Sequence, residues 1–184
     1  ELLAAEIAAA TPGTTVTLKG DVQLGTFLTI DKDVTIDLKG KNITTVETWE
    51  EGGSNSYIFH VTGGGDLTLK GEGRVETAPS DYGMCVWADG GKVTIESGDY
   101  YSPGLETAAC DCIYAKNGGV VIINGGKFGH SGPITNGGAV VNSHNSSPGL
   151  ITVNGGTFYG TLVYEDGDID NGYVVWGEGA VILE

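Results

Sequence analysis

An acidic run near the end of the chain holds the densest group of potential metal ligands. Asp166, Asp168 and Asp170 alternate within it, and carboxylate oxygens are the ligands that calcium prefers. The glycine of the run comes one place later than in an EF-hand loop, and no glutamate follows at the twelfth position. The pattern favours a solvated acidic turn over a calcium site, and calcium is the one cofactor that the sequence offers.

Four aspartates near expected corners of the fold are the candidates for cleaving a sugar polymer. Such chemistry needs two carboxylates at a fixed separation, or a calcium cluster beside a basic residue. No glycosidase-like pattern surrounds these residues, and Arg74 is the only arginine available to neutralise an acidic sugar. We therefore interpret the aspartates as solvated surface acids and expect no catalytic residues. The four are Asp81, Asp89, Asp99 and Asp111.

Four aromatic residues are the candidates for binding a ligand at the surface. An exposed aromatic ring offers a large contact area to a sugar or to a protein partner. The three histidines, in contrast, match neither a Ser-His-Asp spacing nor a zinc-binding spacing. The expected binding residues are Trp49, Tyr57, Tyr101 and Tyr159.

The cysteines are three in number, so they cannot all pair within the chain. Residues 85–88 (Cys-Val-Trp-Ala) align with residues 112–115 (Cys-Ile-Tyr-Ala), which places Cys85 and Cys112 at equivalent positions one repeat apart. We interpret both as small, inward-facing residues that stack on one another. A disulfide between them is the alternative, and it requires suitable directions of the two Cα–Cβ bonds.

A repeated sequence pattern predicts the strands and turns that hold these residues in place. Residues 120–128 (Val-Val-Ile-Ile-Asn-Gly-Gly-Lys-Phe) return as residues 150–158 (Leu-Ile-Thr-Val-Asn-Gly-Gly-Thr-Phe). Looser copies place equivalent strand residues at positions 34, 67, 93, 121, 151 and 181, in steps of 33, 26, 28, 30 and 30 residues. A repeat of strand, turn and glycine without a helix is typical of a stacked β-solenoid, in which like residues lie above like.

Equivalent positions of this repeat are expected to form ladders. Asn124 and Asn154 occupy the same corner, where stacked amide side chains can satisfy backbone groups of the turn. Tyr100, Phe128 and Phe158 likewise predict a stack of aromatic rings. We assign both ladders structural roles.

The composition limits the partners of the protein. Nine lysine and arginine residues face 24 aspartates and glutamates, which gives a formal net charge of −15. Such a surface repels nucleic acids and anionic membranes, because binding to phosphate needs clustered cations. No segment is long and apolar enough to span a bilayer. We therefore expect neither a nucleic-acid partner nor insertion into a membrane.

The chain divides into a short cap and one domain. Residues 1–13 are expected to form a capping helix and turn, and residues 14–184 a single β-domain. The helix is predicted over Leu2 to Ala10, ends at Thr-Pro-Gly, and would cover the open strand edges of the first repeat.

Polar insertions interrupt the repeat at several places. In stacked repeats such insertions tend to gather on one face, which is often the binding face. They are Thr48–Ser56, Thr77–Tyr82, Ser102–Ala109 and His130–Gly138.

The repeated Val-Thr-Ile-x-Gly-Gly-x-Phe/Tyr pattern, with a short helix before it, resembles the right-handed parallel β-helix proteins of the pectate-lyase-like kind. It is most similar to the glycine-rich β-helices of bacteriophage head fibres, tail spikes and bacterial surface adhesins. The resemblance implies an all-β, right-handed, single-stranded parallel β-helix with a short N-terminal capping helix. It also implies a non-catalytic structural or adhesive role on a virion or on a bacterial surface outside the cell, with glycans or proteins as partners. The same fold also carries polysaccharide-degrading lyases and glycoside hydrolases, which are the alternative.

The last strands of the chain lead to an expectation about assembly. Tyr173–Trp176 and Ala180–Leu183 are strongly apolar, and the sequence shows no polar capping repeat after them. The end of a stacked repeat normally needs such a cap. We therefore expect these strands to be covered by sister chains in a homo-oligomer, with a trimer favoured as in the fibres, by other virion or surface proteins, or by residues that this sequence does not include.

Overall fold

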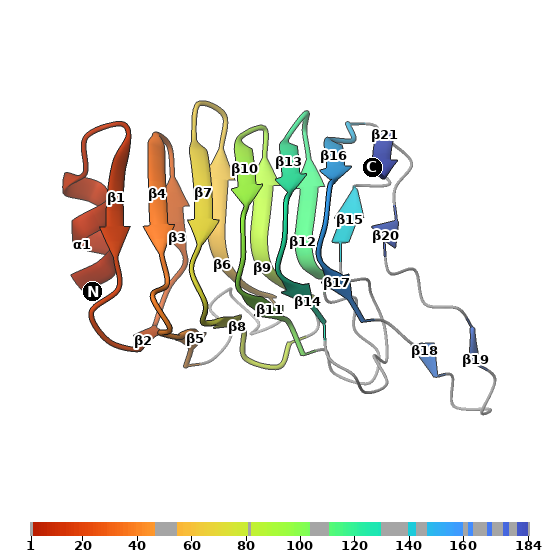
Figure 1. Ribbon diagram of the computed structural model, residues 1–184, viewed down its shortest axis with the longest axis horizontal. Coiled ribbons are helices and arrows are strands. Elements are labelled where there is room, and N and C mark those ends of the chain that lie inside the picture. The colour runs from red at the N-terminus through yellow and green to blue at the C-terminus, as the bar shows by residue number, and fades with distance from the viewer. Residues whose placement is uncertain are drawn as a thin grey trace.

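The computed structural model describes residues 2–46, 55–80, 82–103, 111–129, 140–142, 147–159, 162–163, 169–170, 175–176 and 180–183. These residues are mostly β-strand with one short helix, and none of their helices is long and apolar enough to cross a membrane. The strands form three parallel sheets of seven, six and six strands, which we name A, B and C, and one antiparallel hairpin (Figure 1). This agrees with the predicted all-β class.

Successive strands of the chain go to sheets A, B and C in turn. Sheet A contains β1 (Thr14–Thr17), β4 (Asp33–Asp37), β7 (Asp66–Lys70), β10 (Lys92–Ile95), β13 (Val120–Ile123), β16 (Leu150–Val153) and β21 (Ala180–Leu183). Sheet B contains β2 (Val22–Leu24), β5 (Ile43–Thr45), β8 (Arg74–Glu76), β11 (Asp99–Tyr101), β14 (Lys127–Phe128) and β17 (Thr157–Phe158). Sheet C contains β3 (Leu28–Ile30), β6 (Asn55–Thr62), β9 (Tyr82–Asp89), β12 (Asp111–Lys116), β15 (Val140–Asn142) and β20 (Val175–Trp176). The hairpin joins β18 (Leu162–Val163) and β19 (Ile169–Asp170).

The pairing register of sheet A follows the repeat that the sequence predicts. Val34 lies opposite Leu67 on the neighbouring strand, and Val121 lies opposite Ile151. Strand β21 continues the same register with Val181. Equivalent residues of successive repeats are therefore direct neighbours across the sheet.

Helix α1 (Leu2–Ala9) lies beside β1 at one end of the sheets (Figure 1). Its Leu3 and Ile7 are buried in the same apolar cluster as the strands. Lys32 donates from its ammonium group to the carbonyl oxygen of Ala8 at 2.9 Å, which satisfies an acceptor in the last turn of the helix. The helix predicted from the sequence is thus present and packs against the core.

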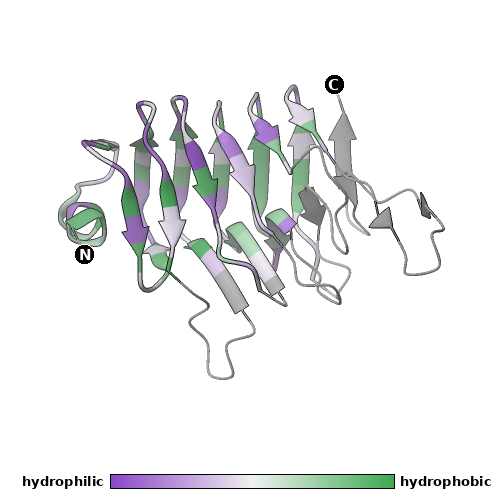
Figure 2. Cartoon of the chain, turned by 90° about the horizontal axis from the view of Figure 1, so that it is seen from below, coloured by the Kyte–Doolittle hydropathy of each residue, from purple (hydrophilic) through white to green (hydrophobic). Residues whose placement is uncertain are grey.

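One apolar core joins residues from all three sheets. Val34 of sheet A, Ile43 of sheet B and Phe59 of sheet C are fully buried in the same cluster. Thr35, between the buried Val34 and Ile36, is only partly covered. Figure 2 shows apolar and polar residues alternating along several strands in this way. The alternation follows from the period of two in a β-strand, where successive side chains point to opposite faces.

The Asn-Gly-Gly turns between sheets A and B satisfy three separate demands. Asn154 donates from Nδ2 to Asn124 Oδ1 at 2.8 Å, and Asn124 donates to Glu96 Oε1 at 2.9 Å. The turns of neighbouring repeats approach so closely that a Cβ atom at Gly125 would lie 2.6 Å from the carbonyl oxygen of Glu96. Gly126 has φ +108°, a backbone conformation that glycine adopts at little cost. Each position of the Asn-Gly-Gly motif therefore requires its residue type for a different physical reason.

The aromatic residues after these turns stack inside sheet B. The ring centroids of Tyr100 and Phe128 are 5.2 Å apart at an interplanar angle of 10°, and those of Phe128 and Phe158 are 4.9 Å apart at 11°. Burial raises the pKa of Tyr100, whose hydroxyl donates to the carbonyl oxygen of Ser97 at 2.9 Å. The stack thus binds three successive repeats through dispersion and burial of apolar area.

Most of the long connections of the chain run from sheet B to sheet C, and we name this side of the molecule the B–C edge. The connection of residues 143–149 runs from sheet C to sheet A instead. The connections from sheet A to sheet B are shorter, as in residues 96–98 and 124–126. The four insertions expected from the sequence fall mainly in the B-to-C connections. These connections are residues 46–54, 77–81, 102–110 and 129–139.

Replacing the middle ring of the aromatic stack is expected to destabilise the fold. Phe128→Ala removes a fully buried ring with partners on both sides, so the free energy of unfolding should fall by about 3–5 kcal/mol. Urea unfolding followed by circular dichroism measures this change. The exposed neighbour Lys127→Ala is the control, with an expected change within about 0.5 kcal/mol. A loss in Phe128→Ala no larger than in this control would contradict a stabilising role for the stack.

Candidate binding surface

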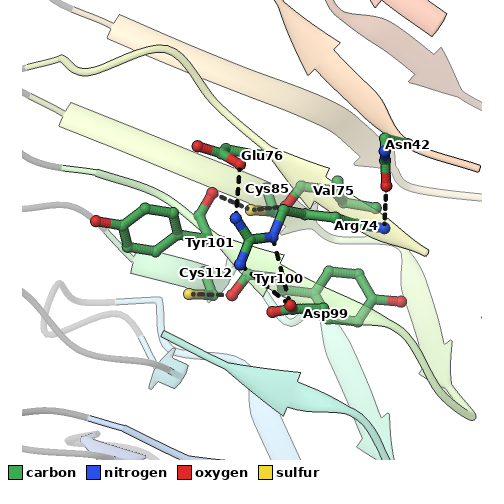
Figure 3. Close-up of polar contacts among 9 residues, drawn as sticks. All are labelled: Asn42, Arg74, Val75, Glu76, Cys85, Asp99, Tyr100, Tyr101 and Cys112. Atoms are coloured by element: carbon green, nitrogen blue, oxygen red, sulfur yellow. Dashed lines mark hydrogen bonds and ion pairs between the residues drawn. The ribbon is translucent and has the colours of Figure 1, made fainter. Parts of the chain in front are cut away.

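The Arg74 cluster lies on the outer face of sheet B and consists of Arg74, Glu76, Asp99 and Tyr101 (Figure 3). Pairing of β8 with β11 sets Arg74 opposite Asp99 and Glu76 opposite Tyr101. The guanidinium group donates from Nη2 to Asp99 Oδ2 at 3.2 Å and from Nη1 to Glu76 Oε2 at 3.2 Å. The only arginine of the chain is therefore held between two carboxylates.

The charges of the cluster stabilise one another. Partial burial lowers the pKa of Arg74, but the charges and hydrogen bonds of Asp99 and Glu76 raise it by more, so the pKa lies above its ordinary value. The arginine side chain is 38% exposed, and solvent screens its ion pairs. The ion pairs therefore matter more for the position of the guanidinium group than for the stability of the fold.

Tyr101 is the aromatic member of the cluster and is held at both its ring and its backbone. The guanidinium carbon of Arg74 lies 5.8 Å from the centre of the tyrosine ring, within the range of a cation–π interaction. The thiol of Cys85 donates to the carbonyl oxygen of Tyr101 at 3.2 Å. A partly exposed ring that is already fixed loses little conformational entropy when it meets a partner.

A shallow groove adjoins the cluster at the corner between sheets A and B. Its volume is about 630 Å³, within the range of small-molecule sites. Glycines of four successive repeats line it together with the polar side chains of Glu72, Asp99, Lys127 and Thr157. Because Asp99 belongs to both features, the groove and the Arg74 cluster form one continuous polar surface.

The four aromatic residues expected to bind a ligand have different surroundings. Tyr101 belongs to the Arg74 cluster, and Tyr159, just after β17, is 36% exposed. Tyr57 is only 5% exposed, because Phe27 and other rings pack against it. The prediction that its ring is exposed is therefore wrong. Trp49 lies outside the described residues. The three described tyrosines all lie near the ends of strands that face the B–C edge.

A hydrogen-bonded pair on sheet C was not predicted from the sequence. His60 Nε2 lies 3.0 Å from Asp89 Oδ2, and Asn117 donates to Asp89 Oδ1 at 2.6 Å. The imidazole ring stacks on Trp87 with centroids 4.4 Å apart, and the buried indole nitrogen has no hydrogen-bond partner. The repeat alignment was the available signal, because it sets His60 opposite Trp87 and Thr62 opposite Asp89.

The remaining predicted residues have structural surroundings or lie outside the described part. Cys85 and Cys112 are buried free thiols on neighbouring strands. Asp111 is buried, so its interpretation as a solvated surface acid is wrong, and Asp81 is not described. Asp89 pairs with His60 and Asp99 pairs with Arg74, so within the described residues these two carboxylates have no basic partner in common.

No group of three or more histidine, cysteine, aspartate or glutamate side chains in the described part of the chain is arranged to hold a metal ion. Asp166 and Asp168 lie outside that part, and Asp170 ends β19. Calcium binding by these three aspartates therefore stays a prediction.

No protein-family model, curated protein or solved structure matches the chain. No relative therefore assigns a role to the Arg74 cluster or to the groove.

The hydrogen-bonded pair of His60 and Asp89 on sheet C is expected to make the stability of the fold depend on pH. Burial raises the pKa of Asp89, but hydrogen bonds from His60 and Asn117 lower it by more, so the pKa lies below its ordinary value. The stabilisation is then fully present above the pKa of the unfolded chain, about 3.9, and is lost as the pH falls through the lower pKa of the folded state. Asp89→Asn should lower the free energy of unfolding at pH 7 by about 1 kcal/mol.

Urea unfolding at a series of pH values from 7 down to the acid range tests whether the stabilisation by Asp89 is lost as the pH falls. The difference between the unsubstituted chain and Asp89→Asn should shrink as the pH falls below about 4. Asp31→Asn, at an exposed aspartate, serves as the control and should show almost no difference at any pH. A difference for Asp89→Asn that grows towards acid pH would contradict the lowered pKa.

Proposed function

We propose that this chain is a non-catalytic structural and adhesive module with the fold of a right-handed parallel β-helix. The fold is supported by the parallel pairing of strands from successive repeats, with one strand per repeat in each sheet. On this proposal the module is displayed outside the cell, either on a virion as part of a head fibre, decoration or tail fibre, or on a bacterial surface. This setting rests on the resemblance of the repeat to proteins of those surfaces.

The observation that carries the binding role is Tyr101, a partly exposed ring that contacts Arg74, whose partner Asp99 lines an open groove. Rigid aromatic residues with polar neighbours are frequent anchors of binding surfaces. The position of this residue adds support, because Tyr101 ends β11 and the connection after it is one of the long ones at the B–C edge. In repeat folds, a face that collects insertions is often the binding face.

A glycan is the partner that this surface matches best, and a protein is the other class of partner. The aromatic ring offers an apolar face to a sugar, while Arg74, Glu76 and Asp99 offer donors and acceptors to hydroxyl groups. The groove runs along four repeats and suits an extended chain. The net charge of −15 favours a neutral glycan over an acidic one, because like charges repel.

A polysaccharide-degrading enzyme is the alternative function. A glycoside hydrolase needs a carboxylic acid that can give its proton to the leaving sugar. Both carboxylates of the Arg74 cluster accept hydrogen bonds from the guanidinium group instead. This arrangement supports binding over cleavage at this surface.

Removing the ring of Tyr101 is expected to weaken glycan binding. Calorimetric titration with a panel of neutral oligosaccharides from bacterial surface polysaccharides measures the affinity. Tyr101→Ala should bind about tenfold more weakly or worse, which corresponds to about 1.4 kcal/mol. Arg74→Lys should show a smaller loss, because lysine keeps the charge but lacks the planar fork that bonds both carboxylates.

The controls of this experiment separate the remaining alternatives. Thr94→Ala on the outer face of sheet A should bind as the unsubstituted chain does. Equal affinity of Tyr101→Ala and the unsubstituted chain would contradict the proposed surface, and release of new reducing ends would favour the enzyme. Titrations with and without calcium test the acidic run, since a calcium requirement that Asp168→Ala abolishes would support a metal site there.

We further propose that the module is a homo-oligomer, with a trimer favoured over other assemblies. Strands β17, β20 and β21 end the three sheets opposite α1, and within the described residues each pairs on one side only. Unpaired edges of parallel sheets attract neighbouring strands unless something covers them. Sedimentation equilibrium over a range of concentrations should give three times the mass of one chain, whereas a monomer at every concentration would refute the assembly.

A further inference from the structure

Cys85 and Cys112 occupy equivalent positions on the paired strands β9 and β12. The register sets Val86 opposite Ile113, so the cysteines that precede them are neighbours across the sheet. Equivalent residues of paired strands lie about 4.8 Å apart, within the range of Cα separations that a disulfide spans.

The two side chains also point in the same direction. Cys85 Sγ lies 3.2 Å from the carbonyl oxygen of Tyr101, and Cys112 Sγ lies 3.1 Å from that of Tyr100 (Figure 3). These carbonyl groups belong to consecutive residues of β11, so both sulfur atoms contact the backbone of the same strand. Both side chains are buried and extend from sheet C towards β11, so their Cα–Cβ bonds do not point apart, which is the directional requirement that the sequence left open.

We propose that Cys85 and Cys112 form a reversible disulfide between β9 and β12 when the protein meets a hydroperoxide. In the first step one thiol attacks the peroxide, the O–O bond breaks, and a sulfenic acid and one water form. In the second step the other thiol attacks that sulfur, the S–S bond forms, and a second water leaves. The first step oxidises one sulfur atom by two electrons and reduces the peroxide, here hydrogen peroxide. In the second step the sulfenic sulfur is reduced while the other thiol is oxidised, so two thiols and one hydrogen peroxide give one disulfide and two water molecules.

Burial raises the pKa of the Cys85 thiol, and the neighbouring Cys112 raises it further, which slows oxidation of Cys85 in the closed fold. Both thiols are buried, so the reaction needs a small oxidant and local opening of the sheets.

Oxidation would change the surroundings of the backbone beneath the Arg74 cluster. The disulfide removes both S–H donors, which leaves the carbonyl oxygens of Tyr100 and Tyr101 without them. Closing the bond also requires the two side chains to approach one another across the sheet. A thiol such as dithiothreitol should open this bond again by thiol–disulfide exchange. This inference does not depend on glycan binding, because it concerns the buried side of β11.

The test uses the full chain with Cys110→Ser, which leaves only the two thiols of interest. The folded protein is treated with hydrogen peroxide, unfolded in the presence of an alkylating agent, and examined by mass spectrometry. The expected result is a loss of two hydrogens and a cross-linked pair of peptides that contain Cys85 and Cys112. Dithiothreitol should restore two alkylatable thiols. Two free thiols after treatment, or sulfinic acid without a cross-link, would overturn the proposal.

Single variants and an unfolded control complete the test. In the Cys110→Ser background, Cys85→Ala and Cys112→Ala should each leave a sulfenic acid that dimedone labels, and neither should form a cross-link within the chain. Absence of labelling in both variants would overturn the proposed sulfenic acid intermediate. In urea the exposed thiols should react faster with peroxide, but a smaller share of the oxidised chain should carry the cross-link. An equal share in urea would show that the fold does not bring the thiols together. In the chain that retains Cys110, preferential pairing with Cys110 would likewise overturn the proposed pair.

Discussion

In-register pairing of equivalent residues across parallel strands is the constraint on which the rest of the structure depends. It sets Asn154 beside Asn124 and Phe128 beside Phe158, so each polar or aromatic side chain finds its partner in the next repeat. A slip of one residue would turn the buried side chains of a strand to the outer face. The ladders and the apolar core therefore enforce the same register.

The same constraint creates a problem for charged residues on the outer faces. Like residues stacked above like would bring equal charges together, which destabilises a sheet. Asp66 illustrates the solution, because it has Asp33 opposite it on one side and Lys92 on the other, with the ammonium group at 2.9 Å. Arg74 and Asp99 repeat this alternation on sheet B. The Arg74 cluster is thus a local product of the register and of a change of sign between neighbouring repeats.

Much of the architecture was predictable from the sequence, because repetition amplifies weak local signals. The strand positions near residues 34, 67 and 121 followed from hydrophobic alternation and spacing, and glycine marked the turns. The contacts of His60 with Asp89 and the burial of Tyr57 were not predicted. Both depend on side chains from different repeats that meet on the outer face of sheet C. Residue types on that face do not repeat strictly, so the repeat does not predict these contacts. Spacing along the chain carries no information about such meetings until the strands are aligned.

The two corners that flank sheet B differ in how much change they can accept. At the A–B corner the turns of neighbouring repeats touch, and a single added carbon at Gly125 would meet the backbone of Glu96. At the B–C edge the connections already differ in length between repeats, as residues 77–81 and 129–139 show. Loops there can be exchanged without disturbing the ladders, since the register is fixed elsewhere. The molecule is therefore a natural scaffold for engineering, in which new loops could be grafted at one edge while the opposite corner stays unchanged.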